Sequence, residues 1–218
     1  MSNPVIVIVG AGPGVSGSVA RAFAADGYDA GLLGMHASQL EELSDELVAG
    51  GSAVEWAIAD VTDAEAATAA VAGFGERFGR IDVLHFNPSA FRQKDPLVLT
   101  ASELLEDVAL GVGALLTALQ AARPFMGAGG RVTATGSMAA DKPWNEAPSL
   151  GVQKAGLRNL VRSIDKTLEP DGIRAVSVTV RGTLSKEGPF TPDNVAAAIH
   201  AAARQDEAEW RTEVPYEG

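Results

Sequence analysis

The stretch that decides the fold is Pro4-Val-Ile-Val-Ile-Val-Gly10-Ala-Gly12-Pro-Gly14-Val-Ser-Gly17-Ser-Val-Ala-Arg-Ala-Phe-Ala24. Its β-branched run, Val5 to Val9, has the length and composition of a buried parallel strand. A glycine-rich turn follows, and the Ala-rich segment after it places Val15, Val19 and Phe23 on one helical face. This order predicts the first half of a dinucleotide-binding unit, in which phosphate oxygens reach backbone N–H groups at the helix start.

The rest of the chain repeats the alternation of strand and helix. Further strands are expected at Asp29–Leu33, Ala53–Ile58, Asp82–Phe86, Arg131–Thr135 and Ala175–Val180, with a last short strand within Trp210–Pro215. Capping boxes are expected at Ser38/Glu41, Thr62/Glu65 and Thr100/Glu103, and Thr191-Pro192 also starts a helix. Such alternation predicts a Rossmann-type α/β fold with a doubly wound parallel sheet. The 218 residues fit one domain, 1–218.

Composition excludes several classes of partner and chemistry. The net charge is −11 with no basic stripe, which disfavours nucleic-acid and anionic-membrane partners. The chain has no cysteine, so disulfides, thiol nucleophiles and Cys-ligated metals are excluded, and no metal site is expected. The first residues lack a basic region and a cleavage site, and their apolar run is too short to span a bilayer. We therefore expect a soluble cytoplasmic protein.

The glycines fit two templates. Gly12-x-Gly14-x-x-Gly17 matches the general dinucleotide fingerprint, whereas Gly10-x-x-x-Gly14-x-Ser16 resembles the opening motif of the short-chain dehydrogenase/reductase family. Ser137, after the fifth strand, and Lys154, seventeen residues later, favour the second template. The resemblance covers Pro4 to about Thr183. It implies an NAD(P)-dependent oxidoreductase that transfers a hydride between a nicotinamide and a small carbonyl or alcohol.

The resemblance also assigns the cofactor-binding residues. They are Gly10, Gly12, Gly14, Val15, Ser16, His36, Asp60, Val61, Asn87 and Lys154. An acidic residue after the second strand would bind the ribose 2′-OH of NAD, and none is present there. Gly34 removes that acid, and His36 and Ser38 can donate to a 2′-phosphate, so NADP is favoured over NAD. The alternative for His36 is a solvated loop residue.

The catalytic residues match the family only in part. Its members use a Ser and a Tyr-x-x-x-Lys; the Tyr exchanges the substrate proton, and the Lys lowers the Tyr pKa and holds the nicotinamide ribose. Ser137 and Lys154 match, but the tyrosine position is Leu150, which cannot exchange a proton. The family's helix Asn, which helps to hold a proton-relay water, falls at Ala109 or Gly111 and is missing.

Three side chains could replace the missing acid: Ser149, Glu146 and His85. Each also has a plain structural or solvated role. Neither Tyr28 nor Tyr216 is placed by sequence to substitute. The segment after Arg181-Gly182-Thr183 is short for the family's substrate lid, which predicts a more open site and weaker exclusion of water.

Three functions therefore remain open from the sequence. The first is a divergent oxidoreductase, and the second is a catalytically silent protein that binds a dinucleotide or another ligand and acts through a partner. The third is a non-redox enzyme that reuses the pocket. The family commonly forms a subunit interface along the helix that contains Ala109–Ala114, whose small residues permit close contact. We therefore expect a homodimer or homotetramer.

Overall fold

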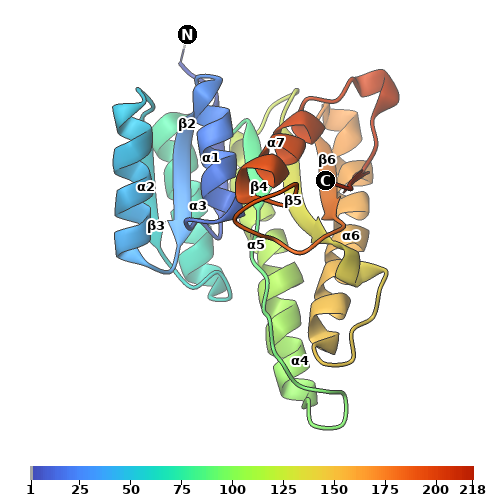
Figure 1. Ribbon diagram of the computed structural model, residues 1–218. Helices are drawn as coiled ribbons and strands as arrows, with labels where there is room; N and C mark the ends of the chain where they lie inside the picture. Colours follow the sequence, from blue (N-terminus) through green and yellow to red (C-terminus); the bar gives the residue numbers. More distant parts are fainter. Residues whose placement is uncertain (1) are drawn as a thin grey trace.

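The computed structural model describes residues 2–218 and shows seven parallel strands with helices on both faces (Figure 1). The strand order is β3-β2-β1-β4-β5-β6-β7. The strands are β1 Val5–Val9, β2 Asp29–Gly34, β3 Val54–Ile58, β4 Val83–Phe86, β5 Arg131–Ser137, β6 Arg174–Val180 and β7 Glu213–Tyr216. The order reverses between β1 and β4, the switch point at which such sheets bind ligands. The Rossmann-type fold predicted from the sequence is confirmed.

The helices form two layers. They are α1 Val15–Ala25, α2 Ala37–Ala49, α3 Ala64–Phe78, α4 Ala101–Val108, α5 Ala114–Ala122, α6 Pro148–Leu168 and α7 Pro192–Ala203, with a π-helical segment η1 Ala109–Gly113 and short 3₁₀ turns η2 Arg123–Phe125, η3 Met138–Ala140, η4 Glu169–Asp171 and η5 Glu207–Glu209. One core cluster joins the sheet to α1, α2 and α7, and the other joins it to α3, α5 and α6. Residues 181–191, between β6 and α7, form neither helix nor strand, in agreement with the expected short lid.

Two predicted helix starts are confirmed. Thr100 accepts the backbone N–H of Glu103, whose carboxylate accepts the Thr100 N–H in return, so α4 begins with a full capping box. Thr191 accepts the N–H of Asn194, and Pro192 is the first residue of α7.

The capping boxes predicted at Ser38/Glu41 and Thr62/Glu65 are wrong. Helix α2 begins at Ala37, so Ser38 already lies inside its first turn, and His36 is the N-cap without a side-chain bond. Helix α3 is capped by the Asp63 carboxylate. A charged acceptor makes a stronger capping bond than a hydroxyl, and this one stands a residue closer to the helix.

The helical stretch Ala101–Phe125 is long and apolar enough, by length and composition, to cross a membrane, with a mean hydropathy of 1.5 over its most apolar window. In this fold it packs against α3 and α6 instead, although only 33% of that window is buried. In Figure 1 its α4 end projects beyond the sheet. The stretch therefore carries apolar surface that the described chain leaves uncovered.

His85 lies in the centre of the sheet. Its side chain is fully buried on β4, opposite Thr133 of β5, and its Nδ1 lies 2.9 Å from the Thr133 hydroxyl. Its Nε2 has no protein partner among residues 2–218. Burial, assisted by the charge of Lys154, lowers the pKa of His85 to about 3, so the ring is neutral in the folded protein at neutral pH.

This buried ring makes stability depend on pH. In the unfolded chain an ordinary imidazole takes up a proton below about pH 6.5, while the folded state resists it down to about pH 3. Neutral His85 therefore makes its full contribution to the free energy of unfolding above pH 6.5, and this contribution is lost as the pH falls towards 3. Between pH 7 and 5 this loss is about 2 kcal/mol. The free energy of unfolding, measured with urea, should decrease between pH 7 and pH 5 in the wild type. In His85→Leu this decrease should be smaller by that amount. His36→Leu, at an exposed position, is the control, and equal slopes in all three proteins would contradict the account.

Candidate active site

A cavity of about 520 Å³ opens at the carboxyl ends of the central strands. Its lining comes from the start of α1, the ends of β4, β5 and β6, the lid segment and α6: Gly14, Val15, Asn87, Pro88, Ser89, Thr135, Gly136, Ser137, Lys154, Val180, Gly182 and Leu184. The cavity therefore brings together five predicted site residues that are widely separated in sequence: Gly14, Val15, Asn87, Ser137 and Lys154. Carboxyl ends of parallel strands share one edge of the sheet, which explains why these residues converge.

The turn between β1 and α1 lies against its neighbours without room for side chains. Gly10 has φ +80°, and a Cβ there would lie 2.9 Å from the Pro88 ring. A Cβ on Gly17 would lie 2.6 Å from the carbonyl oxygen of Gly12. The start of α1 therefore lies close to this turn, and Gly14 and Val15 line the cavity. A helix start of this kind favours anions such as phosphate.

Ser16 holds this turn in shape. Its hydroxyl accepts the N–H of Gly12 at 3.1 Å and lies 3.3 Å from the Gly12 carbonyl oxygen, to which it donates. The side chain is buried. Ser16 thus orders the glycine turn from behind, and we keep its role toward the cofactor as an expectation.

The residues expected around the adenosine half, Gly34, His36, Asp60 and Val61, do not line this cavity. Gly34 ends β2, and a Cβ there would lie 2.6 Å from the Ala11 carbonyl oxygen, so close packing alone requires glycine. His36 is exposed, and no partner is found for its ring among the described residues. Sequence reasoning missed Gln39, whose amide oxygen lies 3.5 Å from the Cβ position of Gly12. No pattern marked it, because it is one polar residue among several on α2.

Asp60 and Val61 divide between surface and core. Asp60 is exposed, and its carboxylate accepts both the backbone N–H and the hydroxyl of Thr62, at 2.9 and 2.7 Å. These bonds lower the pKa of Asp60, so it stays ionised. Val61 packs into the core cluster beneath α3 and α5. Their contact with an adenine ring remains an expectation.

Asn87 ties three central strands together at the cavity wall. Its N–H donates to the carbonyl of Val9 on β1, and its side-chain oxygen accepts the Thr135 hydroxyl from β5 at 2.7 Å. Asn87 therefore links β4 to both of its neighbouring strands at their carboxyl ends. The Pro88 ring fills the space that Gly10 leaves open.

Lys154 is the most unusual charge in the site. It lies on α6, is only 5% exposed, and donates from Nζ to the carbonyl oxygen of Thr135 at 2.8 Å. Burial lowers its pKa to about 8, with no carboxylate acting against that shift. Ser137, at the end of β5, accepts the N–H of Ala139, which leaves its own hydroxyl proton free for a ligand.

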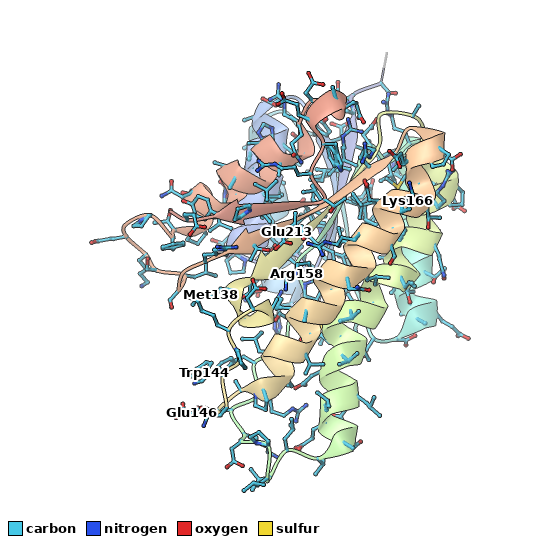
Figure 2. The ribbon with its side chains drawn as sticks, turned by 90° about the vertical axis from the view of Figure 1, so that its right-hand side faces the viewer. Met138, Trp144, Glu146, Arg158, Lys166 and Glu213 are labelled. Carbon is cyan, nitrogen blue, oxygen red and sulfur yellow. The ribbon has the colours of Figure 1, made fainter. Side chains whose placement is uncertain are left out.

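Leu150 lies one helical turn before Lys154 and is half-buried, but it does not line the cavity. The candidate replacement acids are not in the cavity either. His85 is buried and neutral, Ser149 is fully buried with its hydroxyl beside the Asp107 carboxylate, and Glu146 is exposed at the outer edge of the loop before α6 (Figure 2). None of the three is placed to exchange a substrate proton.

The two tyrosines lie elsewhere. Tyr28 packs edge-on against Phe23, before the start of β2 and hence at the opposite edge of the sheet. Tyr216, on β7, donates its hydroxyl to the carbonyl of Pro189 and packs against Phe190. Tyr216 thus anchors the lid segment, and neither phenol lines the cavity.

Gln153 is a buried site residue that sequence reasoning missed. Its amide accepts the N–H of Ala90 at 2.9 Å and donates to the Ala90 carbonyl, which pins the loop that carries Pro88 and Ser89. A Cβ on Gly111 would overlap the Gln153 amide oxygen, so the glutamine fills the space beside η1 at one of the two positions considered for the missing Asn. A polar residue on the buried face of a predicted helix was the available signal.

Arg92 fixes the next part of the same loop. Its guanidinium makes hydrogen bonds to the buried Asp107 at 2.9 to 3.2 Å. Burial opposes ionisation of Asp107, but the Arg92 bonds keep the pKa of that carboxyl below its usual value. Lys94 binds Glu103 on the same helix. The loop wall of the cavity is therefore held at successive points along its length.

On the other side, Arg158 of α6 ties the segment after Ser137 to the last strand. It contacts Asp141 at 2.7 Å and Glu213 of β7 at 3.0 Å (Figure 2). Glu213 also accepts the hydroxyl of Thr179 on β6. These bonds give Ser137 a rigid setting.

Comparisons with known proteins agree with this geometry. Residues 4–187 match the short chain dehydrogenase family. The chain is 29% identical over 184 residues to the oxidoreductase UcpA of Escherichia coli, covering 82% of this chain and 68% of that protein. It is 28% identical over 221 residues to serine 3-dehydrogenase of Rhizobium radiobacter, covering 92% and 88%.

Solved structures show the same fold. A short chain dehydrogenase from Mycobacterium smegmatis superposes with a TM-score of 0.87 at 24% identity, covering 100% of this chain and 93% of that one. A metagenomic short-chain oxidoreductase in complex with NADP gives the same TM-score and identity, covering 98% and 96%. The family match spans most of the chain, from β1 through the lid segment. On this match the protein belongs to the short-chain dehydrogenase/reductase family.

Proposed function

We propose that this protein is an NADP-dependent reductase of small carbonyl compounds that acts in reverse as an NADP-dependent alcohol dehydrogenase, with an altered proton donor. The observation that carries the proposal is the joint presence of Ser137 and Lys154 in a cavity that also opens onto the start of α1. That arrangement provides a phosphate-binding helix start, a cation for a ribose and a hydroxyl donor for a carbonyl oxygen.

The residues fit the expected dinucleotide. The α1 start and the glycine turn would hold the diphosphate, and Lys154, with two N–H groups beyond its bond to Thr135, would hold the nicotinamide ribose. The cofactor supplies the hydride. NADP is favoured over NAD because no acid stands at Gly34 and because His36 and Ser38 are exposed beside the turn. We place the protein in the cytoplasm, as a soluble member of its family.

Leu150 favours a second candidate function. A chain that has lost the tyrosine could bind the dinucleotide without turnover and act through a partner. The two candidates differ in one measurable respect, because the reductase oxidises NADPH when a carbonyl is added and the silent binder does not. Both require cofactor binding, which is tested first.

Substitution at Gly12 tests the cofactor loop. The Cβ position of Gly12 meets only the Gln39 amide, at an ordinary contact distance of 3.5 Å. Gly12→Asp would place a carboxylate beside the bound phosphates, a repulsion on the order of 1–2 kcal/mol near a protein surface. Titration calorimetry should show NADPH bound by the wild type and weakened about ten-fold or more by Gly12→Asp relative to the isosteric Gly12→Asn. Equal affinities for the two variants would refute the placement, and tighter binding of NADH than NADPH would refute the preference.

Substitution at Leu150 tests the vacant acid position. Leu150→Tyr restores a phenol one helical turn before Lys154, whose positive charge would lower the phenol pKa. General acid catalysis contributes about 10²–10⁴ in rate, so kcat for an activated ketone should rise at least about ten-fold. Leu150→Phe supplies the ring without the hydroxyl and is the matched control. A gain in both variants, or in neither while NADPH still binds, would show that Leu150 is not the limiting residue.

We also propose that the protein is a homo-oligomer built on the uncovered side of α4 and α5. The small residues do not share one face: Gly111 and Ala114 are buried, and Ala109 and Gly113 are exposed. The outward pair lies beside Leu105, which is 66% exposed. Close contact of helices at small residues, flanked by an exposed leucine, suits a second copy of the same surface.

The oligomer is tested by a charge on that surface. Leu105→Glu should shift the protein towards monomers in light scattering at micromolar concentration, because an unpaired carboxylate in an apolar interface is strongly unfavourable. Val48→Glu is the control, since Val48 is 53% exposed on the distant helix α2. A wild type that is monomeric at this concentration would end the proposal.

A further inference from the structure

A reductase of carbonyls needs a proton source as well as a hydride source. The usual phenol is absent at Leu150, and the three other candidates named above lie outside the cavity or cannot ionise suitably. Among the described residues that line the cavity, Lys154 is the one with an ionisable side chain. The other polar groups there are the hydroxyls of Ser89, Thr135 and Ser137 and the amide of Asn87.

We propose that Lys154 itself delivers the proton to the substrate oxygen. The inference rests on the proposed reductase function and deepens it. In the step, the carbonyl carbon accepts the hydride of the reduced nicotinamide while the carbonyl oxygen accepts a proton from the Lys154 ammonium. The products are the alcohol, the oxidised nicotinamide and a neutral Lys154 amine, which regains its proton from solvent before the next turnover.

The geometry of Lys154 suits this role. Its ammonium carries three protons, and one is donated to the Thr135 carbonyl at 2.8 Å. That bond fixes Nζ at the end of β5, next along the strand to Gly136 and Ser137. The remaining donors can serve a ribose and a substrate oxygen, while the Ser137 hydroxyl supplies a second donor to that oxygen.

The acidity of Lys154 also suits it. An ordinary lysine would hold its proton too tightly, whereas burial brings the pKa of Lys154 to about 8. Such a group is still mostly protonated at pH 7 and is acidic enough to give the proton up, which is the condition for efficient general acid catalysis. No paired carboxylate offsets this effect of burial.

The rates of reduction and of oxidation should depend on pH in opposite directions. Reduction requires the ammonium form, so the rate should be constant below about pH 7 and should fall ten-fold per unit above about pH 8. Alcohol oxidation requires the neutral amine and should rise over the same range. A lysine that only holds the ribose would change KM for NADPH with pH and leave kcat unchanged.

The test compares the wild type with Lys154→Arg. Arginine keeps a cation and several donors, but its pKa lies far above that of Lys154 and prevents proton transfer at neutral pH. We expect NADPH affinity to stay within a few-fold, kcat for ketone reduction to fall about 10²–10⁴-fold, and the inflection near pH 8 to vanish. Lys142→Arg, at an exposed lysine, is the control and should behave as the wild type. If Lys154→Arg fails to fold, Lys154→Ala with added methylamine replaces it, and rescue of kcat by the amine is expected.

A second readout needs no cofactor. The chain has five lysines. In the cofactor-free protein labelled at lysine Cε, the resonance missing from Lys154→Arg or Lys154→Ala should titrate near pH 8. Unchanged kcat and pH profile in Lys154→Arg would overturn the proposal. A wild type that binds NADPH and reduces no activated ketone would overturn the proposed reductase function, on which the proposal rests. Absence of NADPH binding would instead overturn the proposed function, whatever the lysine titration shows.

Discussion

The site depends on one constraint, the close approach of backbone to backbone at the β1–α1 turn. Gly17 lies against the carbonyl of Gly12, and Gly34 lies against the carbonyl of Ala11, at distances where a Cβ would be only 2.6 Å away. These contacts bring α1, β1 and β2 together at the carboxyl edge of the sheet. Because the turn carries no bulky side chains and Gly14 and Val15 line the cavity, a phosphate can approach the start of α1.

The second determinant is the burial of a single cation. Lys154 is held by one carbonyl oxygen in a site without a carboxylate, which is unfavourable for a charge and is tolerated at functional sites. The surroundings are rigid: Gln153 pins the loop at Ala90, and Asn87 joins β4 to β1 and β5. This rigidity survives without the family's tyrosine and helix asparagine. The proposed function therefore assigns the cavity a conserved binding role and an altered source of the proton.

The sequence predicted the sheet, the alternation of helices and the convergence of Ser137, Lys154 and Asn87, because strand composition and motif spacing are local signals. It predicted two capping boxes wrongly, because α2 is capped at His36, two residues before Ser38, and α3 is capped by Asp63, the residue after Thr62. It missed Gln153 and Gln39, whose roles depend on which surfaces meet after folding. The burial of His85 and Ser149 could not be predicted from the sequence either, because their neighbours come from distant strands and helices. The structural reason for Gly34 was also not predictable from the sequence, because its packing against Ala11 requires glycine whichever cofactor binds.

We infer that the cavity binds a nicotinamide dinucleotide and presents Lys154 to the reacting carbon and oxygen. The most direct measurement is a crystal structure soaked with NADPH and a ketone analogue. The account predicts the diphosphate at the start of α1, the nicotinamide ring in the cavity beside Ser137, and Lys154 Nζ within hydrogen-bond distance of both the ribose and the analogue's oxygen. A dinucleotide bound with Lys154 out of reach of that oxygen, or a cavity that takes up no dinucleotide, would contradict it.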